Sequence, residues 1–286
     1  MQWFYFAVLA AAAFGLLAGT SKKLLKSTDV YIFTALLHIT GLTVFAPYFL
    51  YNFDISGLPL TGLMAAILSG LLNCVAVYFF NSSIHLGELS EQIPLTRLSP
   101  IFTAILGFLL LNETMSLSKI SGILLMTAGS ILVLKEPGYS ILDSFKKIFT
   151  NKAASLAVLS AVMYAMTSIV DRVGTQLIRP QVYLVIIYSV IATTFTLIAI
   201  KRGKPEFKKV YSENMPLYIV SGILTIIGSL SIFHAFSLAE ASVVMPILQL
   251  QALIAVGIGG VYFKEKQLLM KTVGVSILII GLIFLL

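Results

Sequence analysis

The stretch that decides the fold is GELSEQIP at residues 87–94, which returns 152 positions later as AEASVVMP at residues 239–246. The glutamate, the serine and the proline keep their places in both copies, and no gap is needed across residues 69–134. Hydrophobic residues coincide easily by chance in an apolar chain, whereas Pro, Glu, Lys and Gly rarely do. The further matches of this kind are Gly70 with Gly222, Gly107 with Gly259, Glu113 with Glu265, Lys119 with Lys271, Gly122 with Gly274 and Gly129 with Gly281. The sequence therefore indicates two copies of one structural unit.

The composition indicates a membrane protein. Hydrophobic residues make up 58% of the 286 residues and charged residues 11%, and the mean hydropathy is +0.99. Soluble domains have roughly 45–50% and about 25% of these classes, so this chain has too little polar surface to cover a compact body in water. Disorder needs the opposite composition. Despite the net charge of +7, we expect no nucleic-acid binding, because Lys and Arg of membrane proteins chiefly set the orientation of loops.

Ten apolar runs reach the length of about 20 residues that a membrane-spanning helix needs. The predicted spans are 3–21, 30–51, 60–82, 90–111, 119–135, 153–171, 181–200, 215–237, 241–263 and 270–286. Lys22, Lys23 and Lys26 follow the first run and no basic residue precedes it, so we expect a retained helix rather than a signal peptide. Each half holds five spans, an odd number, so the halves must enter the membrane from opposite sides. The predicted fold is an all-α integral membrane protein with ten transmembrane helices in two inverted five-helix repeats.

The predicted repeats cover residues 1–135 and 153–286, joined by a linker over residues 136–152. Apolar residues of this linker recur at helical spacing opposite several lysines, which favours a helix lying flat on an anionic leaflet over a plain polar linker. Of the 19 Lys and Arg residues, 15 follow odd-numbered spans and 3 follow even-numbered spans. The positive-inside rule then places the odd-numbered loops in the cytoplasm and both termini outside.

Arg97 is the most informative single residue, because it lies roughly 12 Å into the fourth span. A charge at that depth usually faces the protein interior. Its repeat mate is Gln249, and Ser99 with Gln251 forms a second matched polar pair. Our hypothesis is that Arg97 attracts a carboxylate of the substrate while Gln249, Gln251 and Ser99 add neutral hydrogen bonds. The alternative is that Arg97 extends to the interface or forms a structural ion pair with Glu88, Glu91 or Asp171.

Other polar residues within the spans are further candidates for contact with substrate, although bonding helices together is the default role of such residues. They are Asn73, Tyr78, Asn81, Tyr164 and His234.

Pro94 and Pro246 each remove a backbone donor and crowd the carbonyl of a serine four residues earlier, Ser90 or Ser242. We expect a kink at each proline, which acts either as a hinge beside the transport pathway or as a fixed bend.

Glycines and acids at span ends suggest structural roles. Gly15 and Gly19 form a GxxxG pattern, which we expect to pack the first helix inside the bundle rather than to make a dimer. Glu113 and Glu265 precede the fifth and tenth spans, where an anion suits the N-terminus of the following helix.

With these repeats the chain resembles the drug/metabolite transporter superfamily and, within it, the ten-helix EamA-type permeases. The resemblance rests on residues 239–246 with Glu265 and Gly281, and on residues 87–94 with their counterparts Glu113 and Gly129. It implies ten helices around a cavity lined chiefly by helices 1, 3, 4, 6, 8 and 9, and the transport, usually export, of small molecules. Such permeases are usually drawn with cytoplasmic termini, which opposes the charge count.

The related small multidrug resistance proteins exchange protons for cations at a glutamate in the first helix. Residues 1–28 hold no Asp or Glu, so a cationic drug pump is not expected. The chain also has no HExxH, Cys/His metal cluster, P-loop or Gly-x-Ser-x-Gly motif. We therefore expect no enzymatic activity, no cofactor and no metal site.

The leading hypothesis is a plasma-membrane secondary transporter that exports amino acids or related carboxylates by alternating access, as a monomer or a homodimer. Uniport and coupling to a proton are both open. The alternatives are a lipid or lipid-precursor flippase and a membrane receptor or assembly subunit that does not transport.

The orientation is testable by cysteine labelling. In a Cys74→Ser background, Lys204→Cys should react with a membrane-impermeant maleimide only when the cytoplasmic side is accessible, because the charge count places this loop inside. Labelling of this cysteine from the outside of intact cells would show that the protein has the opposite orientation.

Overall fold

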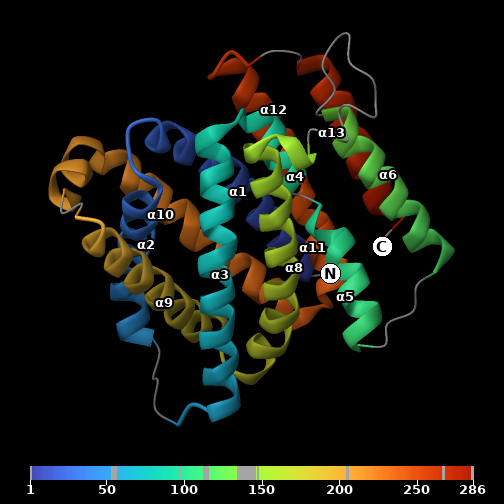
Figure 1. The fold of residues 1–286 in the computed structure, drawn as a ribbon. Coiled ribbons are helices and arrows are strands. Elements are labelled where there is room, and N and C mark those ends of the chain that lie inside the picture. The colour runs from blue at the N-terminus through green and yellow to red at the C-terminus, as the bar shows by residue number, and fades with distance from the viewer. Residues whose placement is uncertain are drawn as a thin grey trace.

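The computed structural model describes residues 2–52, 57–96, 98–111, 116–133, 146, 148–203, 206–265 and 268–284. These residues form helices and short connections, with no strand among them (Figure 1). The helices of the first half are α1 (Gln2–Leu25), α2 (Val30–Asn52), α3 (Leu60–Leu86), α4 (Leu89–Thr96), α5 (Ser99–Leu111) and α6 (Leu117–Val133). Those of the second half are α8 (Lys152–Leu177), α9 (Pro180–Lys201), α10 (Phe207–Leu238), α11 (Ala241–Ile247), the 3₁₀ turn η1 (Leu248–Leu250), α12 (Gln251–Val261) and α13 (Leu268–Ile283).

Seven stretches of the described chain are long and apolar enough to cross a membrane. They are α1, α2, α3, the α4–α5 stretch Leu89–Leu109, α8, α9 and α10. Two further apolar helices, Gln251–Val261 and Leu268–Gly281, are shorter. An all-helical, multi-pass membrane protein is therefore confirmed, while the count of ten spans stays a prediction. The predicted interfacial helix over residues 136–152 falls mostly outside the described residues.

Two predicted spans are broken at equivalent places in the two halves. The span 90–111 divides into α4, which ends at Thr96, and α5, which begins at Ser99. The span 241–263 passes from α11 through η1 into α12. Each break lies just after a proline, at 94 or 246. A 3₁₀ stretch within a helix, such as η1, often marks a hinge or local strain.

Two other spans are longer than predicted. The run 153–171 is followed by polar residues, yet α8 continues to Leu177. The helix α10 begins at Phe207 rather than 215 and bends at Asn214, where φ is −129° and ψ is 20°. Pro216 lies two residues beyond this bend. Apolar periodicity alone missed both extensions because polar residues are tolerated in a helix wherever the bundle supplies partners for them.

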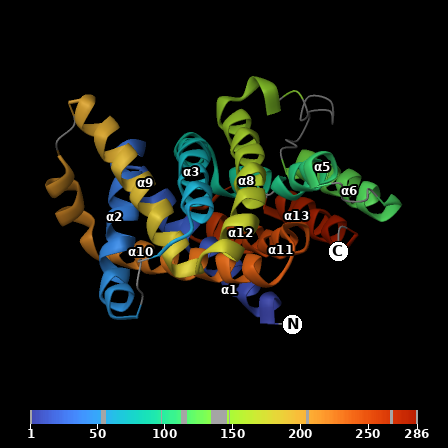
Figure 2. The same ribbon diagram turned by 90° about the horizontal axis from the view of Figure 1, so that it is seen from below.

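Helix contacts follow the repeat. The contact of α1 with α10 is matched by that of α8 with α3, and the contact of α1 with α12 by that of α8 with α5. Two pairs, α2 with α9 and α6 with α13, join a helix to its own repeat mate. These two pairs lie at opposite edges of the molecule, with α3 and α8 between them (Figures 1 and 2). A pseudo-twofold relation between the halves accounts for these paired contacts.

The α6–α13 contact is built from repeat-matched glycines. A Cβ at Gly129 would lie 2.6 Å from the carbonyl oxygen of Gly274, and one at Gly281 would lie 2.8 Å from that of Gly122. Backbones this close leave no space for side chains, which is the usual reason for small residues between membrane helices. The sequence matched these four glycines as mates, and the structure brings them together in one interface.

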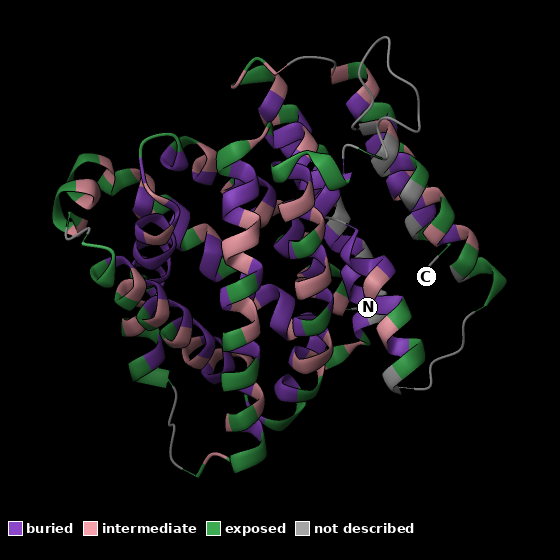
Figure 3. Ribbon diagram, in the orientation of Figure 1, coloured by how far each residue is buried: buried purple, intermediate pink, exposed green. Residues whose placement is uncertain are grey.

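The outer surface is apolar. Leu60, Met64, Leu68, Leu71 and Val75 form an exposed stripe along α3 at helical spacing. Figure 3 shows buried residues on the inward helix faces and exposed residues on the outward faces. An apolar stripe of this length on a soluble protein would drive association, whereas hydrocarbon solvates it.

The GxxxG pattern of α1 packs within the chain, as expected, and supplies a stability test. A Cβ at Gly15 would lie 2.8 Å from Cβ of Ile254, whereas one at Gly257 would meet nothing within 4 Å. Gly15→Ala should lower stability by about 1–3 kcal/mol through overpacking. Gly257→Ala, the matched control, should be neutral or stabilising by up to about 1 kcal/mol. Thermal unfolding in detergent measures both.

Adding Ile254→Gly to Gly15→Ala removes the Cβ, Cγ2 and Cδ1 atoms that the new methyl would meet and should recover part of the lost stability. Equal melting temperatures for the two glycine variants would contradict the tight α1–α12 contact.

Candidate functional site

A central cavity lies between the two halves. About 170 Å³ of it is open to the centres of water molecules, many times the roughly 10–15 Å³ that one water needs. Residues of α1, α2 and α3 line it from the first half, and residues of α8, α9, α10, α11, η1 and α12 from the second. Compared with the wall that the family resemblance implied, α2 and α9 are additions, and no described residue of α4 or α5 takes part.

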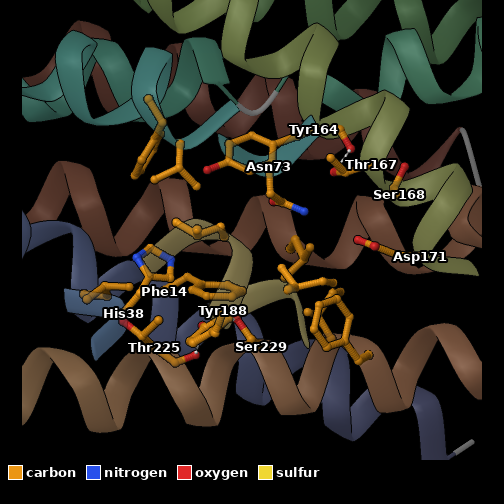
Figure 4. A pocket seen from close by; sticks show the side chains of 18 of the residues that line it. Phe14, His38, Asn73, Tyr164, Thr167, Ser168, Asp171, Tyr188, Thr225 and Ser229 are labelled. Carbon is orange, nitrogen blue, oxygen red and sulfur yellow. Dashed lines mark hydrogen bonds between the residues drawn. The ribbon is translucent and has the colours of Figure 1, made fainter. Parts of the chain in front are cut away.

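The cavity has apolar and polar walls. Its apolar side chains are mainly aromatic and aliphatic, and include Phe14, Phe80, Phe233 and Phe236. Its polar side chains form two groups that face one another across the space (Figure 4). One group lies on α3 and α8, and the other on α2, α9 and α10. A site with these walls suits a small molecule that has both a polar group and an apolar part.

The first polar group centres on Asp171 of α8, which is 5% exposed. Two hydroxyls donate to its Oδ1, from Ser69 of α3 and from Tyr183 of α9 at 2.9 Å. The amide of Asn73 donates in turn to Ser69, at 3.1 Å to Oγ. A Cβ at Gly174 would lie 2.2 Å from the Tyr183 ring, so this glycine makes room for the ring one turn below the carboxylate. Three helices therefore hold Asp171 in place.

The second polar group centres on Tyr188 of α9. Its hydroxyl lies 2.7 Å from Oγ of Ser229 and 3.1 Å from the carbonyl oxygen of Thr225, to which it donates. The ring of His38 packs edge-on against Tyr188, with 4.8 Å between the centroids. The His38 Nδ1 lies 2.8 Å from the carbonyl oxygen of Thr34. These contacts fix the side chains of the second group.

The structure places four of the predicted contact residues in the cavity wall: Asn73, Asn81, Tyr164 and Gln251. Asn81 is bonded through Nδ2 to Oγ1 of Thr34 at 2.9 Å. Gln251 is 2% exposed, and its Nε2 has no hydrogen-bond partner in the described chain. Lining the cavity fits contact with substrate but does not test it, so the roles of these residues stay predictions.

Three other predicted residues lie outside the wall. Tyr78 stacks on Tyr31 at 5.3 Å between ring centroids. His234 stacks on Phe6 at 5.2 Å, and its Nε2 lies 3.1 Å from Nε2 of Gln181. Ser99 is 1% exposed at the start of α5.

The remaining predicted site residues fall partly or wholly outside the description. Arg97 is not among the described residues, and the structure describes the backbone but not the side chains of Gln249, Ser242 and Pro246. Ser90 and Pro94 are both buried in α4. Whether the proline segments act as hinges stays a prediction.

Ser90 belongs to a polar cluster at the start of α4. The carboxylate of Glu265 accepts the backbone N–H groups of Leu89 at 2.7 Å and Ser90 at 2.8 Å. Glu265 therefore caps α4 of the opposite repeat, which corrects the expectation that it serves the helix after it. The capping is favourable because the first N–H groups of a helix lack partners and carry positive potential.

Lys271 completes this cluster. Its ammonium donates to Glu88 and, at 2.7 Å, to Oγ of Ser90, and it lies 3.8 Å from Glu91. Glu88 and Glu91, two acids considered as partners for Arg97, are thus neighbours of Lys271. The cluster joins the first repeat to α13 of the second.

Sequence reasoning missed His38 and Tyr188, and it considered Asp171 as a partner for Arg97 or, together with Glu88 and Glu91, as an acid that amines would point to. Asp171 ended a predicted span because Arg172 follows it, and the two charges looked like a flank. Arg172 instead donates to the carbonyl of Phe236. Its repeat mate Lys22, 150 positions earlier in this part of the repeat, does the same to the carbonyl of Ile84.

The model of the EamA-like transporter family matches the chain in two segments, residues 1–135 and 151–286. A stretch of 67 residues is 34% identical to an uncharacterized protein of Methanocaldococcus jannaschii, covering 23% of this chain and 49% of that protein. The chain thus matches about half the length of this relative. A solved crystal structure superposes with a TM-score of 0.68 over 97% of this chain and 95% of its own, at 15% identity. At that identity the likeness shows a shared fold alone.

The cluster at α4 is testable by removing its cation. Lys271 is 2% exposed, so Lys271→Ala leaves Glu88 without its ammonium partner. We expect a loss of about 2–3 kcal/mol, below the roughly 3–5 kcal/mol of a fully buried pair, because the Glu88 side chain is 45% exposed. Thermal unfolding measures the loss, with Lys208→Ala on the exposed surface as the control. Indistinguishable melting curves for the two variants would contradict the assigned pair.

Proposed function

The chain belongs to the EamA-like transporter family, and we propose that it carries small polar metabolites across the membrane by alternating access. The observation that carries this proposal is the cavity between the two halves, lined by polar groups from both. A binding space at the interface of two repeats can open to either side when the halves rock against each other. The pseudo-twofold contacts supply two related interfaces for such rocking.

Amino acids or related carboxylates are the proposed substrates, and export the proposed direction. The cavity combines buried amide and hydroxyl groups with aromatic walls, which suits a compact molecule with polar and apolar parts. Arg97 is the proposed partner of the carboxylate, with Gln249 and Gln251 adding neutral hydrogen bonds. Proton antiport and uniport are both compatible with this scheme.

The placement of the polar groups favours a metabolite over the alternative of a lipid or lipid-precursor flippase. A flippase needs a lateral opening and contacts for a head group near one interface, whereas the polar side chains here lie on both sides of a space between the two halves. A receptor that binds without transporting is separated from a transporter by counterflow in proteoliposomes. Rapid exchange of labelled substrate would exclude the receptor.

The substrate class is testable with a thermal-shift screen of purified protein against amino acids, organic acids, amines and nucleosides. A ligand that binds only the folded state raises the melting temperature by mass action. We expect carboxylates to stabilise the wild type, and Arg97→Gln to reduce their affinity by about tenfold or more, since hydrogen bonds to charged groups contribute about 1.5–3 kcal/mol. Counterflow of the same compound should slow in parallel.

Exposed Arg179→Gln is the control for this experiment, because it removes a guanidinium far from the cavity wall. An Arg97→Gln protein that folds and moves carboxylates at the normal rate would contradict the role of Arg97. Failure of every compound in counterflow would contradict transport itself.

A further inference from the structure

We propose that Asp171 binds an ammonium group of the transported molecule through its second carboxylate oxygen, Oδ2, so that the substrate is an amine with an apolar body. This inference rests on the proposed function and specifies the substrate class of the same cavity.

The two oxygens of Asp171 are not equivalent. Both hydroxyl donors, from Ser69 and Tyr183, bond to Oδ1. No described residue donates to Oδ2. The buried side-chain atoms without partners in the described chain are Gln92 Oε1, Tyr218 OH and Gln251 Nε2. Asp171 lines the cavity, so Oδ2 is the carboxylate oxygen left for a ligand there.

The charge of this carboxylate has no counterion among the described residues. Arg172, the next residue along α8, donates to the carbonyl of Phe236. Its guanidinium nitrogens also lie 2.9 and 3.0 Å from the side-chain amide of Gln176, whose oxygen accepts from them once the amide is turned to satisfy both groups. The described acid–base contacts, such as Lys271 with Glu88, lie outside the cavity wall. An unpaired carboxylate within a membrane is costly, and a cationic ligand would offset that cost.

The neighbouring wall presents acceptors rather than donors. Thr167 and Ser168 line the cavity beside Asp171 on α8 (Figure 4). Their hydroxyl hydrogens are already given to carbonyls of their own helix, at 2.9 and 2.8 Å. Their oxygens are therefore left as acceptors, and that of Ser168 also lies 3.3 Å from Oγ1 of Thr103. An ammonium group has three donors and no acceptor, so it complements this wall, whereas a carboxylate does not.

Binding of matched probes tests the inference. Isopentylamine and isopentanol share one apolar body and differ in the ammonium group. We expect the amine to raise the melting temperature of the wild type more than the alcohol does, with an apparent Kd that Asp171→Asn weakens by about tenfold or more. Asparagine keeps an oxygen for Ser69 and Tyr183 and can turn its NH₂ group to the Oδ2 position, where it repels another donor. The control is Glu213→Gln, which removes an exposed charge in α10 and should leave the Kd unchanged.

A second variant guards against misfolding of Asp171→Asn. Asp171→Glu keeps the charge and should bind the amine within a few-fold of the wild type. If neither variant folds, the comparison of amine with alcohol on the wild type decides. Equal effects of the two probes, or equal amine affinity in wild type and Asp171→Asn, would overturn the proposal.

Two further outcomes would also overturn it. Stabilisation by sodium ions that Asp171→Asn removes, with no response to the amine, would make the site one for an inorganic cation. Binding of the amine by Arg97→Gln but not by the wild type would show that Oδ2 is occupied by Arg97.

Counterflow with leucine and with 2-hydroxyisocaproate, its counterpart without the amine, separates this inference from the proposed function. We expect Asp171→Asn to lose most of the preference for leucine. If the wild type and Asp171→Asn both transport the hydroxy acid at the rate of leucine, the inference about Asp171 is contradicted. The proposal that the protein is a transporter would still stand. If neither compound nor any other in the screen is exchanged, transport is contradicted, and the isopentylamine titration still decides the role of Asp171.

Discussion

Hydrocarbon offers no hydrogen-bond partner, so most polar groups inside this bundle bond to others within the chain or line the cavity. That constraint explains where polar residues lie. The hydroxyls of Ser69 and Tyr183 meet Asp171, the amide of Asn81 meets Thr34, and the carboxylate of Glu265 meets the first N–H groups of α4. The apolar surface then remains outside for lipid.

The pseudo-twofold relation extends to single side chains but stops at the charge in the cavity. Arg172 and Lys22 occupy equivalent places and bond equivalent carbonyls. Asp171 corresponds instead to Ser21, which also lines the cavity, and Tyr183 corresponds to Phe33. The hydroxyl of Ser221, the mate of Ser69, donates to Thr20 at 2.8 Å. One half therefore holds an acid where the other holds a neutral hydroxyl. The two walls of the cavity thus differ in charge although the helices around them are related by symmetry.

The sequence predicted the two-repeat helical fold better than it predicted the residues that line the cavity. Matched Gly, Pro and Glu residues predicted the repeat, because close backbones, broken helices and capped termini each demand particular residue types. The apolar runs predicted the helices but not their ends, since Asp171 resembled the flank of a span until its partners on α3 and α9 were known. His38 and Tyr188 carried no signal of their own: a single polar residue in an apolar run looks the same whether it faces a cavity or a neighbouring helix. The positions that require contacts between distant helices were therefore the ones that spacing could not reveal.

The cap on α4 has a consequence for how the protein is made. Glu265 follows α12, near the end of the chain, yet it completes the first turn of a helix in the first half. During synthesis that half enters the membrane long before Glu265 leaves the ribosome. Until then the N–H groups of Leu89 and Ser90 lack their carboxylate acceptor. The first repeat therefore reaches its final form only as translation ends, which makes the two halves interdependent in biogenesis although each carries a complete set of helices.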